Sequence, residues 1–167
     1  IFIEWCYEVN NRNQVCNAGL AIAALAVWEK APILCRDVLE SSIARNRLAM
    51  ESLYAPDGIY DEGAVYWSYG TTFEIALLDA LESILGTDYG LSEVPGFDRT
   101  PYFEINMFSS TGREQDFFNY ADTEDSLTLP GCIWYFVRRS GDSGFLWPVR
   151  EIYEQPSLLC DKYCDDR

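Results

Sequence analysis

One stretch of this sequence, VCNAGLAIAALAVWE at residues 15–29, constrains the fold more than any other. Its side chains are small and apolar on nearly every face of a helical projection. A helix without a polar face must be buried, and small side chains let neighbouring helices approach it closely. The sequence therefore predicts a protein built from helices that pack around this segment.

Two longer helices are predicted to follow it. The first runs from about residue 33 to residue 54, where Pro56 and an Asp57-Gly58 turn end it. Its apolar stripe consists of Cys35, Leu39, Ile43 and Met50. The second runs from about residue 66 to residue 85, and Gly86 is a natural terminator. Short connections of this kind favour antiparallel neighbours.

The second half of the chain has a different pattern. The segments YFEINMFSS and QDFFNYAD predict a small β-hairpin across TGRE, within residues 100–122. Two short helices are predicted at about residues 131–139 and 145–153. We expect residues 1–167 to form a single, mainly helical domain, because a chain of this size buries roughly 70% of its unfolded surface.

The net charge of −15, with only 12 lysines and arginines, disfavours a nucleic acid or an anionic membrane surface as partner. No apolar run reaches the length of a membrane span, and no signal-peptide pattern is visible. The first residues already resemble the body of an element, so we expect a longer natural polypeptide. Cys16 and Cys35 lie in apolar patterns and are expected to be reduced thiols. A zinc site at Cys160 and Cys164 is disfavoured without histidine.

Because the chain contains no histidine, proton transfer near neutral pH must come from carboxylates, tyrosines, cysteines or lysines. Two clusters contain such groups or polar amides. The first, NNRNQVCN at residues 10–17, either caps the following helix or points amides into a cleft that binds a carboxylate or sugar hydroxyls.

The second cluster is PDGIYDEGAVYWSYGTT at residues 56–72. Tyr66 and Tyr69 are three residues apart at a helix start and so lie on roughly one face. Their rings either fill the core or stack on the apolar face of a pyranose, where a tyrosine hydroxyl can transfer protons. Glu62 can orient a neighbouring tyrosine or a backbone amide.

Together, these clusters resemble the heparinase II/III-like family. The matching segments are NQVCNAGLAIAALAV, YAPDGIYDEGAVYWSYGTTFEIALLDALES, GTDYGLSEVPGF and FNYAD, which cover most of residues 10–125. The tyrosine segment is also similar to the corresponding part of dermatan sulfate epimerase. The resemblance implies an α/α toroid of helical hairpins, of which this chain is the later part. It also implies a secreted or periplasmic location, and further domains or a second copy covering exposed helix faces.

The family resemblance further implies an acidic, uronic-acid-containing polysaccharide as substrate. The C5 proton of the uronate is removed and the 4-linked sugar leaves, with a tyrosine as acid or as acid and base. Tyr69 matches this tyrosine, and Asn13 and Gln14 match an asparagine–histidine pair that grips the carboxylate. Gln14 cannot accept a proton but can donate a hydrogen bond. The expected substrate-binding residues are Arg12, Asn17, Glu62, Tyr66 and Trp67.

Three functions remain open at this point. The first is a lyase in which Tyr69 performs both proton transfers. The second is an inactive carbohydrate-binding or structural fragment of a toroid, because the family's histidines and zinc ligands have no counterpart in this sequence. The third is a glycoside hydrolase that uses Asp57, Asp61 or Glu62. No cofactor or metal is expected, and the lyase requires Tyr69 to share one cleft with Asn13 and Gln14.

Overall fold

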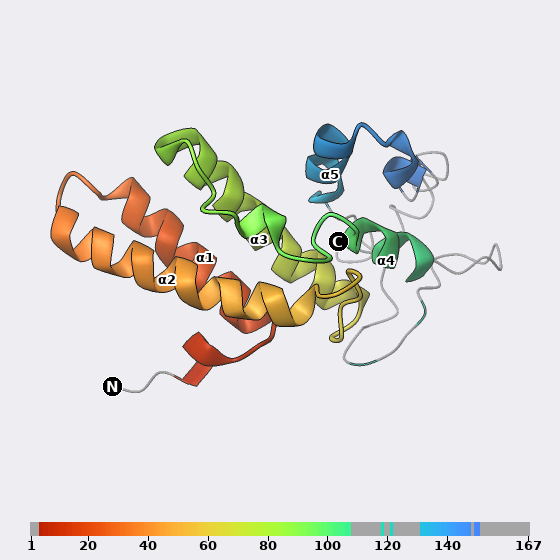
Figure 1. Ribbon diagram of the computed structural model, residues 1–167, viewed down its shortest axis with the longest axis horizontal. Coiled ribbons are helices and arrows are strands. Elements are labelled where there is room, and N and C mark those ends of the chain that lie inside the picture. The colour runs from red at the N-terminus through yellow and green to blue at the C-terminus, as the bar shows by residue number, and fades with distance from the viewer. Residues whose placement is uncertain (1–3, 108–117, 119–120, 122–130, 148, 151–167) are drawn as a thin grey trace, which may run out of the picture.

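A computed structural model of the chain describes residues 4–107, 118, 121, 131–147 and 149–150. These residues form helices, and none of them belongs to a β-strand, which confirms the predicted all-α class. The α-helices are α1 (Asn11–Ala26), α2 (Pro32–Leu53), α3 (Ala64–Leu85), α4 (Thr100–Met107) and α5 (Ile133–Ser140). The 3-10 turns are η1 (Glu4–Tyr7), η2 (Leu91–Glu93) and η3 (Ser143–Leu146). Figure 1 shows α1 and α2 as a hairpin beside α3, with α4 and α5 at the other end of the molecule.

Helix α1 confirms the prediction from its small apolar side chains. Ala18 and Ala21 are completely buried, and α1 packs against both α2 and α3. The helix begins at Asn11, earlier than its apolar pattern indicated, because the Asn10 side chain accepts a hydrogen bond from the backbone N–H of Asn13. The capping role that the asparagine cluster suggested is therefore present at Asn10.

Helices α2 and α3 also lie where the sequence predicted them. The stripe on α2 faces the core: Cys35, Leu39 and Met50 are buried, and Ile43 is half-buried. Gly86 ends α3 in the left-handed conformation, with φ of 72°, and its N–H donates to the carbonyl of Glu82. The long helices could be predicted because one face of each is buried in the core, and their apolar residues therefore recur with the helical period.

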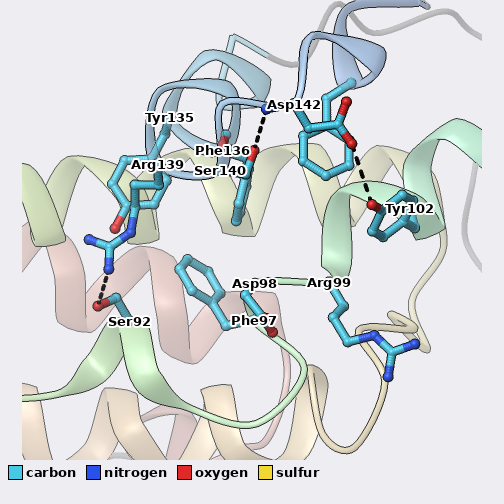
Figure 2. A pocket seen from close by; sticks show the side chains of 11 residues that line it. Ser92, Phe97, Asp98, Arg99, Tyr102, Tyr135, Phe136, Arg139, Ser140 and Asp142 are labelled. Atoms are coloured by element: carbon cyan, nitrogen blue, oxygen red, sulfur yellow. Dashed lines mark hydrogen bonds between the residues drawn. The ribbon is translucent and has the colours of Figure 1, made fainter.

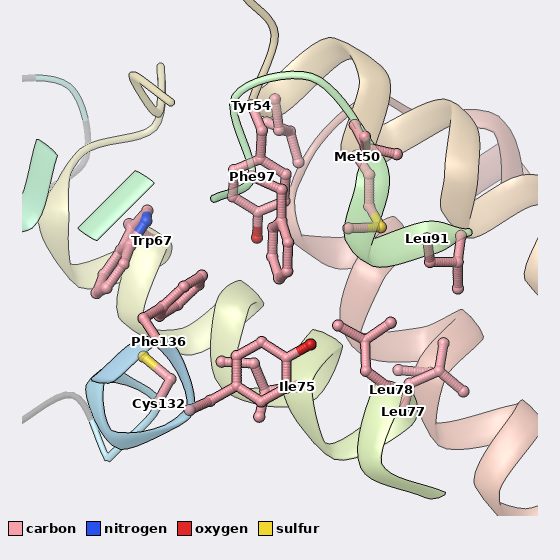
Figure 3. Close-up of a cluster of buried hydrophobic side chains, with 14 of the residues drawn as sticks. Met50, Tyr54, Trp67, Ile75, Leu77, Leu78, Leu91, Phe97, Cys132 and Phe136 are labelled. Carbon is pink, nitrogen blue, oxygen red and sulfur yellow. The ribbon is translucent and has the colours of Figure 1, made fainter. Parts of the chain in front are cut away.

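The core is rich in aromatic side chains that join α3 to the segment after it (Figure 3). Phe97 contacts Tyr54 and Phe136, with ring centroids 5.1 and 5.2 Å apart. The indole N–H of Trp67 donates to Thr100 Oγ1 at 2.7 Å, and Thr100 Oγ1 donates to the carbonyl of Gly58, also at 2.7 Å. These bonds fix the start of α4 against the start of α3 and the turn before it.

The predicted β-hairpin is wrong for residues 102–107, which belong to α4. Thr100, Phe103 and Glu104 are buried, a spacing of three and four residues that matches one face of a helix. The amide of Asn106 donates to the carbonyl of Tyr102, one turn earlier. The remainder of the predicted hairpin, apart from residues 118 and 121, lies outside the described residues.

The two short helices predicted near the C-terminus are found in part. Helix α5 matches the prediction for residues 131–139, and η3 forms at the start of the predicted 145–153 segment. Residues 151–153 lie outside the described residues. Within the described ranges, the structure contains no helix with the length and apolarity that crossing a bilayer would require.

Candidate functional site

An open pocket of about 380 Å³ lies between the N-terminal ends of α1 and α3, and we call it the Tyr69 pocket. The described residues that line it are Asn10, Asn11, Arg12, Val15, Cys16, Glu62, Tyr66 and Tyr69. It therefore combines the two segments that the sequence singled out. Its volume lies in the range of about 300–1,000 Å³ that is common for small-ligand sites.

Glu62 joins the two sides of this pocket. Its carboxylate accepts hydrogen bonds from the backbone N–H of Asn11 at 2.6 Å and from the Asn11 side-chain amide at 2.7 Å. A carboxylate is favourable at the first turn of a helix, where backbone N–H groups lack intrahelical partners. Glu62 thus holds a backbone amide, one of the two roles that its sequence position suggested, and it fixes α1 against the loop before α3.

Tyr69 and Arg12 present the polar groups that a ligand in this pocket would meet. Tyr69 is 49% exposed, and its ring packs edge-on against Phe73 with centroids 5.3 Å apart. The Arg12 side chain is 66% exposed and pairs with Glu8 at 3.5 Å. Exposed ion pairs of this kind stabilise a protein by about 0–1 kcal/mol, so Arg12 can turn to a ligand carboxylate at small cost.

Cys16 is a free cysteine on the pocket wall. Partial burial raises the pKa of its thiol, despite the opposing effect of Arg12. At neutral pH the side chain is therefore a thiol and a weak nucleophile, because the thiolate is the reactive form. The expectation that Cys16 and Cys35 are reduced agrees with their free state in the structure.

Asn13 does not face the Tyr69 pocket. It is completely buried, and its amide donates to the carbonyls of Cys6 and Glu8 at 3.1 and 2.8 Å. Its side-chain oxygen accepts from Asn17, which is also completely buried. Asn13 and Asn17 thus attach the N-terminal segment and η1 to the inner face of α1.

Gln14 is buried as well, on the side of α1 that faces α3. Its oxygen accepts from the hydroxyl of Tyr60 at 2.7 Å, and its nitrogen donates to Tyr54 at 2.9 Å and to Glu74 at 3.4 Å. The hydroxyl of Tyr54 also bonds Thr71 at 2.9 Å. We call Gln14, Tyr54, Tyr60, Thr71 and Glu74 the Gln14 network. All five side chains are buried in the interior.

The expected cleft shared by Tyr69, Asn13 and Gln14 is therefore corrected. Arg12, Glu62, Tyr66 and Tyr69 come together in the pocket, whereas Asn13, Gln14, Asn17 and Trp67 are completely buried. Helical geometry gives the reason. Successive residues turn by about 100°, so Arg12 and Gln14 point roughly 200° apart on α1 and cannot face one cleft together.

Asn10, Asn11, Val15 and Cys16 line the pocket although they were not among the expected site residues, and Glu74 is a buried acid that was not expected. Helical spacing held the signal for Val15, because positions 12, 15 and 16 share a face. Glu74 lies three and four residues from the buried Leu77 and Leu78, so the pattern of α3 also places it in the core. Burial raises the pKa of Glu74 to about 8, although the amides of Asn46 and Gln14 oppose the shift.

The carboxylates considered for a glycoside hydrolase are engaged elsewhere or face solvent. Asp57 accepts a hydrogen bond from the N–H of Ile59, as its turn position predicted, and Glu62 binds Asn11. Asp61 is exposed. In the ranges that the structure describes, no cluster of three cysteine or acidic side chains is arranged to hold a metal ion. Compared with known protein families and with curated proteins, this chain gave no match.

Proposed function

We propose that this chain is part of an α/α toroid that binds a uronic-acid-containing polysaccharide in the Tyr69 pocket and cleaves it by β-elimination, with Tyr69 as the proton shuttle. The observation that carries this proposal is the meeting of Tyr69, Tyr66 and Arg12, from two separate helices, around one open pocket. Phenol groups, amides and a guanidinium are the chemistry that an acidic sugar requires.

The chemistry balances with one tyrosine. The Tyr69 phenolate removes the C5 proton of the uronate, and the resulting carbanion is stabilised by the adjacent sugar carboxylate. The bond between C4 and the leaving oxygen then breaks as the C4–C5 double bond forms. Tyr69 returns the proton to the leaving oxygen, so the enzyme ends in its starting state. Among the described lining residues, Arg12 is the cation available to pair with the sugar carboxylate.

The exposed end of α2 supports the proposed toroid. Ile33 and Leu34 are 73% and 64% exposed at the start of this helix. These two adjacent side chains form a small apolar surface, which a neighbouring hairpin of a complete toroid would cover.

Binding without cleavage is the second candidate, and the burial of Asn13 and Gln14 favours it. With both amides inside the protein, the sugar carboxylate would meet fewer hydrogen-bond donors than in the arrangement that the resemblance implies. Elimination needs the carboxylate neutralised because negative charge develops beside it. A site with one guanidinium can hold the sugar and still lack the power to ionise its C5–H bond.

One assay separates the two candidates. The protein is incubated with a panel of uronic-acid polysaccharides, and the unsaturated product is followed by its ultraviolet absorbance. We expect absorbance from the natural sequence and none from Tyr69→Phe, with Tyr89→Phe as an exposed tyrosine control outside the pocket.

Arg12→Gln is expected to weaken polysaccharide binding by about tenfold, since a charged hydrogen bond contributes about 1.5–3 kcal/mol. Saturable binding that depends on Arg12, with no absorbance change, supports the second candidate. If the polysaccharides neither bind nor react, both candidates are wrong.

A further inference from the structure

A second and larger pocket lies between η2, α4, α5 and η3, and we call it the Arg139 pocket (Figure 2). Its volume is about 490 Å³, and no described residue lines both this pocket and the Tyr69 pocket. Phe97 lies on one side and Phe136 on the opposite side, while Arg139 reaches toward Ser92 at one end. Neither the family resemblance nor the proposed elimination uses this pocket.

Tyr102 provides an aromatic wall with a fixed orientation. It is 49% exposed, so a ligand can reach its ring. The buried ring of Phe145 packs edge-on against it, with centroids 4.9 Å apart and planes at 73°. An aromatic side chain that is already ordered loses little conformational entropy when a ligand stacks on it. Such a ring suits the flat, hydrogen-bearing face of a pyranose.

Two charged groups are also held in place around the pocket. The Arg139 guanidinium donates to Ser92 at 3.2 Å and to Glu82 at 3.3 Å, and it lies over the ring of Tyr135. The Asp142 carboxylate accepts from the N–H of Gly144 at 2.8 Å, and among the described residues its second oxygen has just a long 3.5 Å contact with the Tyr102 hydroxyl. The pocket therefore offers ordered donors and a carboxylate oxygen with spare accepting capacity.

The charges around the pocket do not favour an anion. Asp98 and Asp142 are acidic lining residues, whereas Arg139 is already paired with Glu82 and Arg99 turns its guanidinium away from the other side chains (Figure 2). An anionic ligand would thus meet carboxylates and an arginine whose charge is already neutralised, whereas a hydroxyl-rich neutral ligand can donate to Asp142 and accept from Arg139. Tyr102 and Asp142 lie together at one end of the pocket, and Arg139 lies at the other end beside Ser92 (Figure 2), so the ring and carboxylate suit one sugar residue and the guanidinium suits a neighbouring one.

We propose that the Arg139 pocket binds a neutral pyranose oligosaccharide, one residue of which stacks on Tyr102 and donates a hydroxyl to Asp142, while a neighbouring residue accepts a hydrogen bond from Arg139. This site is independent of the proposed elimination at Tyr69. It gives the chain a second sugar-binding surface of different charge preference, and it stands even where the polysaccharide assay fails.

Calorimetric titration of the intact chain with cellotetraose and with the N-acetylglucosamine tetramer tests the proposal. We expect saturable binding of at least one of them and about tenfold weaker binding in Tyr102→Ala, the size of change expected for an aromatic contact. Asp142→Asn keeps an oxygen for the Gly144 N–H but removes the charge, and it should weaken binding several-fold. Trp134→Ala is the matched control, because Trp134 is an exposed aromatic on α5 that does not line the pocket.

Three results would overturn the proposal. The first is that neither neutral tetramer binds saturably. The second is that a tetramer binds but Tyr102→Ala and Asp142→Asn leave its affinity unchanged, which places the sugar elsewhere. The third is that a glucuronate-containing tetrasaccharide binds this pocket more tightly than the neutral ones, which contradicts the charge argument. Circular dichroism of each variant verifies that the helices are retained.

Discussion

The hydroxyl of Tyr60 donates a 2.7 Å hydrogen bond to the side-chain oxygen of Gln14, a residue 46 positions earlier in the chain. Both side chains are completely buried. This bond joins the loop before α3 to the first turns of α1, and residues of both segments also line the Tyr69 pocket. It makes Gln14, which the family resemblance placed among the catalytic residues, a residue that holds together the two walls of the pocket.

Removing this bond should destabilise the protein measurably. Tyr60→Phe leaves the Gln14 oxygen without the hydroxyl donor, and an unsatisfied buried acceptor costs about 1–3 kcal/mol. Gln14→Leu removes the partner of three side chains at once and should cost more, about 2–4 kcal/mol. Urea denaturation followed by circular dichroism measures both. Tyr89→Phe is the control, and an equal loss there would show that the Tyr60 bond has no special role.

Two helical glycines give a matched pair of predictions. A methyl group on Gly70 would lie 2.5 Å from the Gln14 oxygen and 2.6 Å from the Tyr60 hydroxyl, so Gly70→Ala must push the Gln14 network apart. Beyond the backbone of its own helix and its chain neighbours, a methyl group on Gly19 in α1 would meet no atom within 4 Å. Because alanine favours helices over glycine by about 1 kcal/mol, Gly19→Ala should stabilise the protein, whereas Gly70→Ala should destabilise it by about 1–3 kcal/mol.

Thermal and urea unfolding of the two variants test this opposition. Gly70→Ala should also alter ligand affinity at the Tyr69 pocket, since Tyr69 is the neighbouring residue, and Gly19→Ala should not. Equal stabilisation of both variants would mean that the network shifts without cost, and our account of its tight packing would be wrong.

The long helices could be predicted from the sequence because each has one strong periodic pattern. Helix α4 could not be predicted in this way. Its residues Phe103, Ile105 and Met107 alternate with polar ones, which favours a strand on local grounds. The hydrogen bonds from Trp67 to Thr100 and from Thr100 to Gly58 fix the start of the segment, and burial then follows the helical period. Contacts of this kind join distant parts of the chain and leave no local pattern.

The site could be predicted only in outline. The two sequence clusters correctly placed Arg12 and Tyr69 near the starts of two helices. Which amides face the pocket depends on the rotation of α1, which its uniformly apolar surface does not reveal. Asn10, by capping α1, and Glu62, by binding Asn11, hold the first turn of α1 in place, with Arg12 facing outward and Asn13 inward.

The segment between η2 and α4 gives another test of close packing, because it approaches the turn that follows α2. Gly96 has φ of +85°, and a methyl group there would lie 2.8 Å from the backbone nitrogen of Gly58 and would also meet the carbonyl of Tyr54. Gly86 has a similar φ of +72° but open space around it. Gly86→Ala should therefore cost about 1 kcal/mol for backbone strain alone, and Gly96→Ala should cost clearly more. Urea midpoints of the two variants compare these costs, and equal losses would contradict the steric argument.

Glu74 makes the stability of this protein depend on pH. Burial raises its pKa in the folded state to about 8, from an ordinary value near 4.5 that applies in the unfolded chain. Between these values the folded state holds a proton that the unfolded state has released, so the free energy of unfolding falls as pH rises. The contribution of Glu74 is complete below about pH 4.5 and is lost as pH rises through about 8.

Replacing this carboxyl should remove its part of the pH dependence. Glu74→Gln cannot ionise, and its side-chain oxygen can still accept from Gln14, so we expect a flatter dependence of the unfolding free energy between about pH 5 and 8. One proton corresponds to about 1.4 kcal/mol per pH unit, which sets the largest change in slope. Burial also raises the pKa of Glu104, and its contribution persists in the variant. Urea unfolding across this range, with the exposed Glu40→Gln as control, measures the difference, and an unchanged slope in Glu74→Gln would show that Glu74 is ionised inside the folded protein at neutral pH.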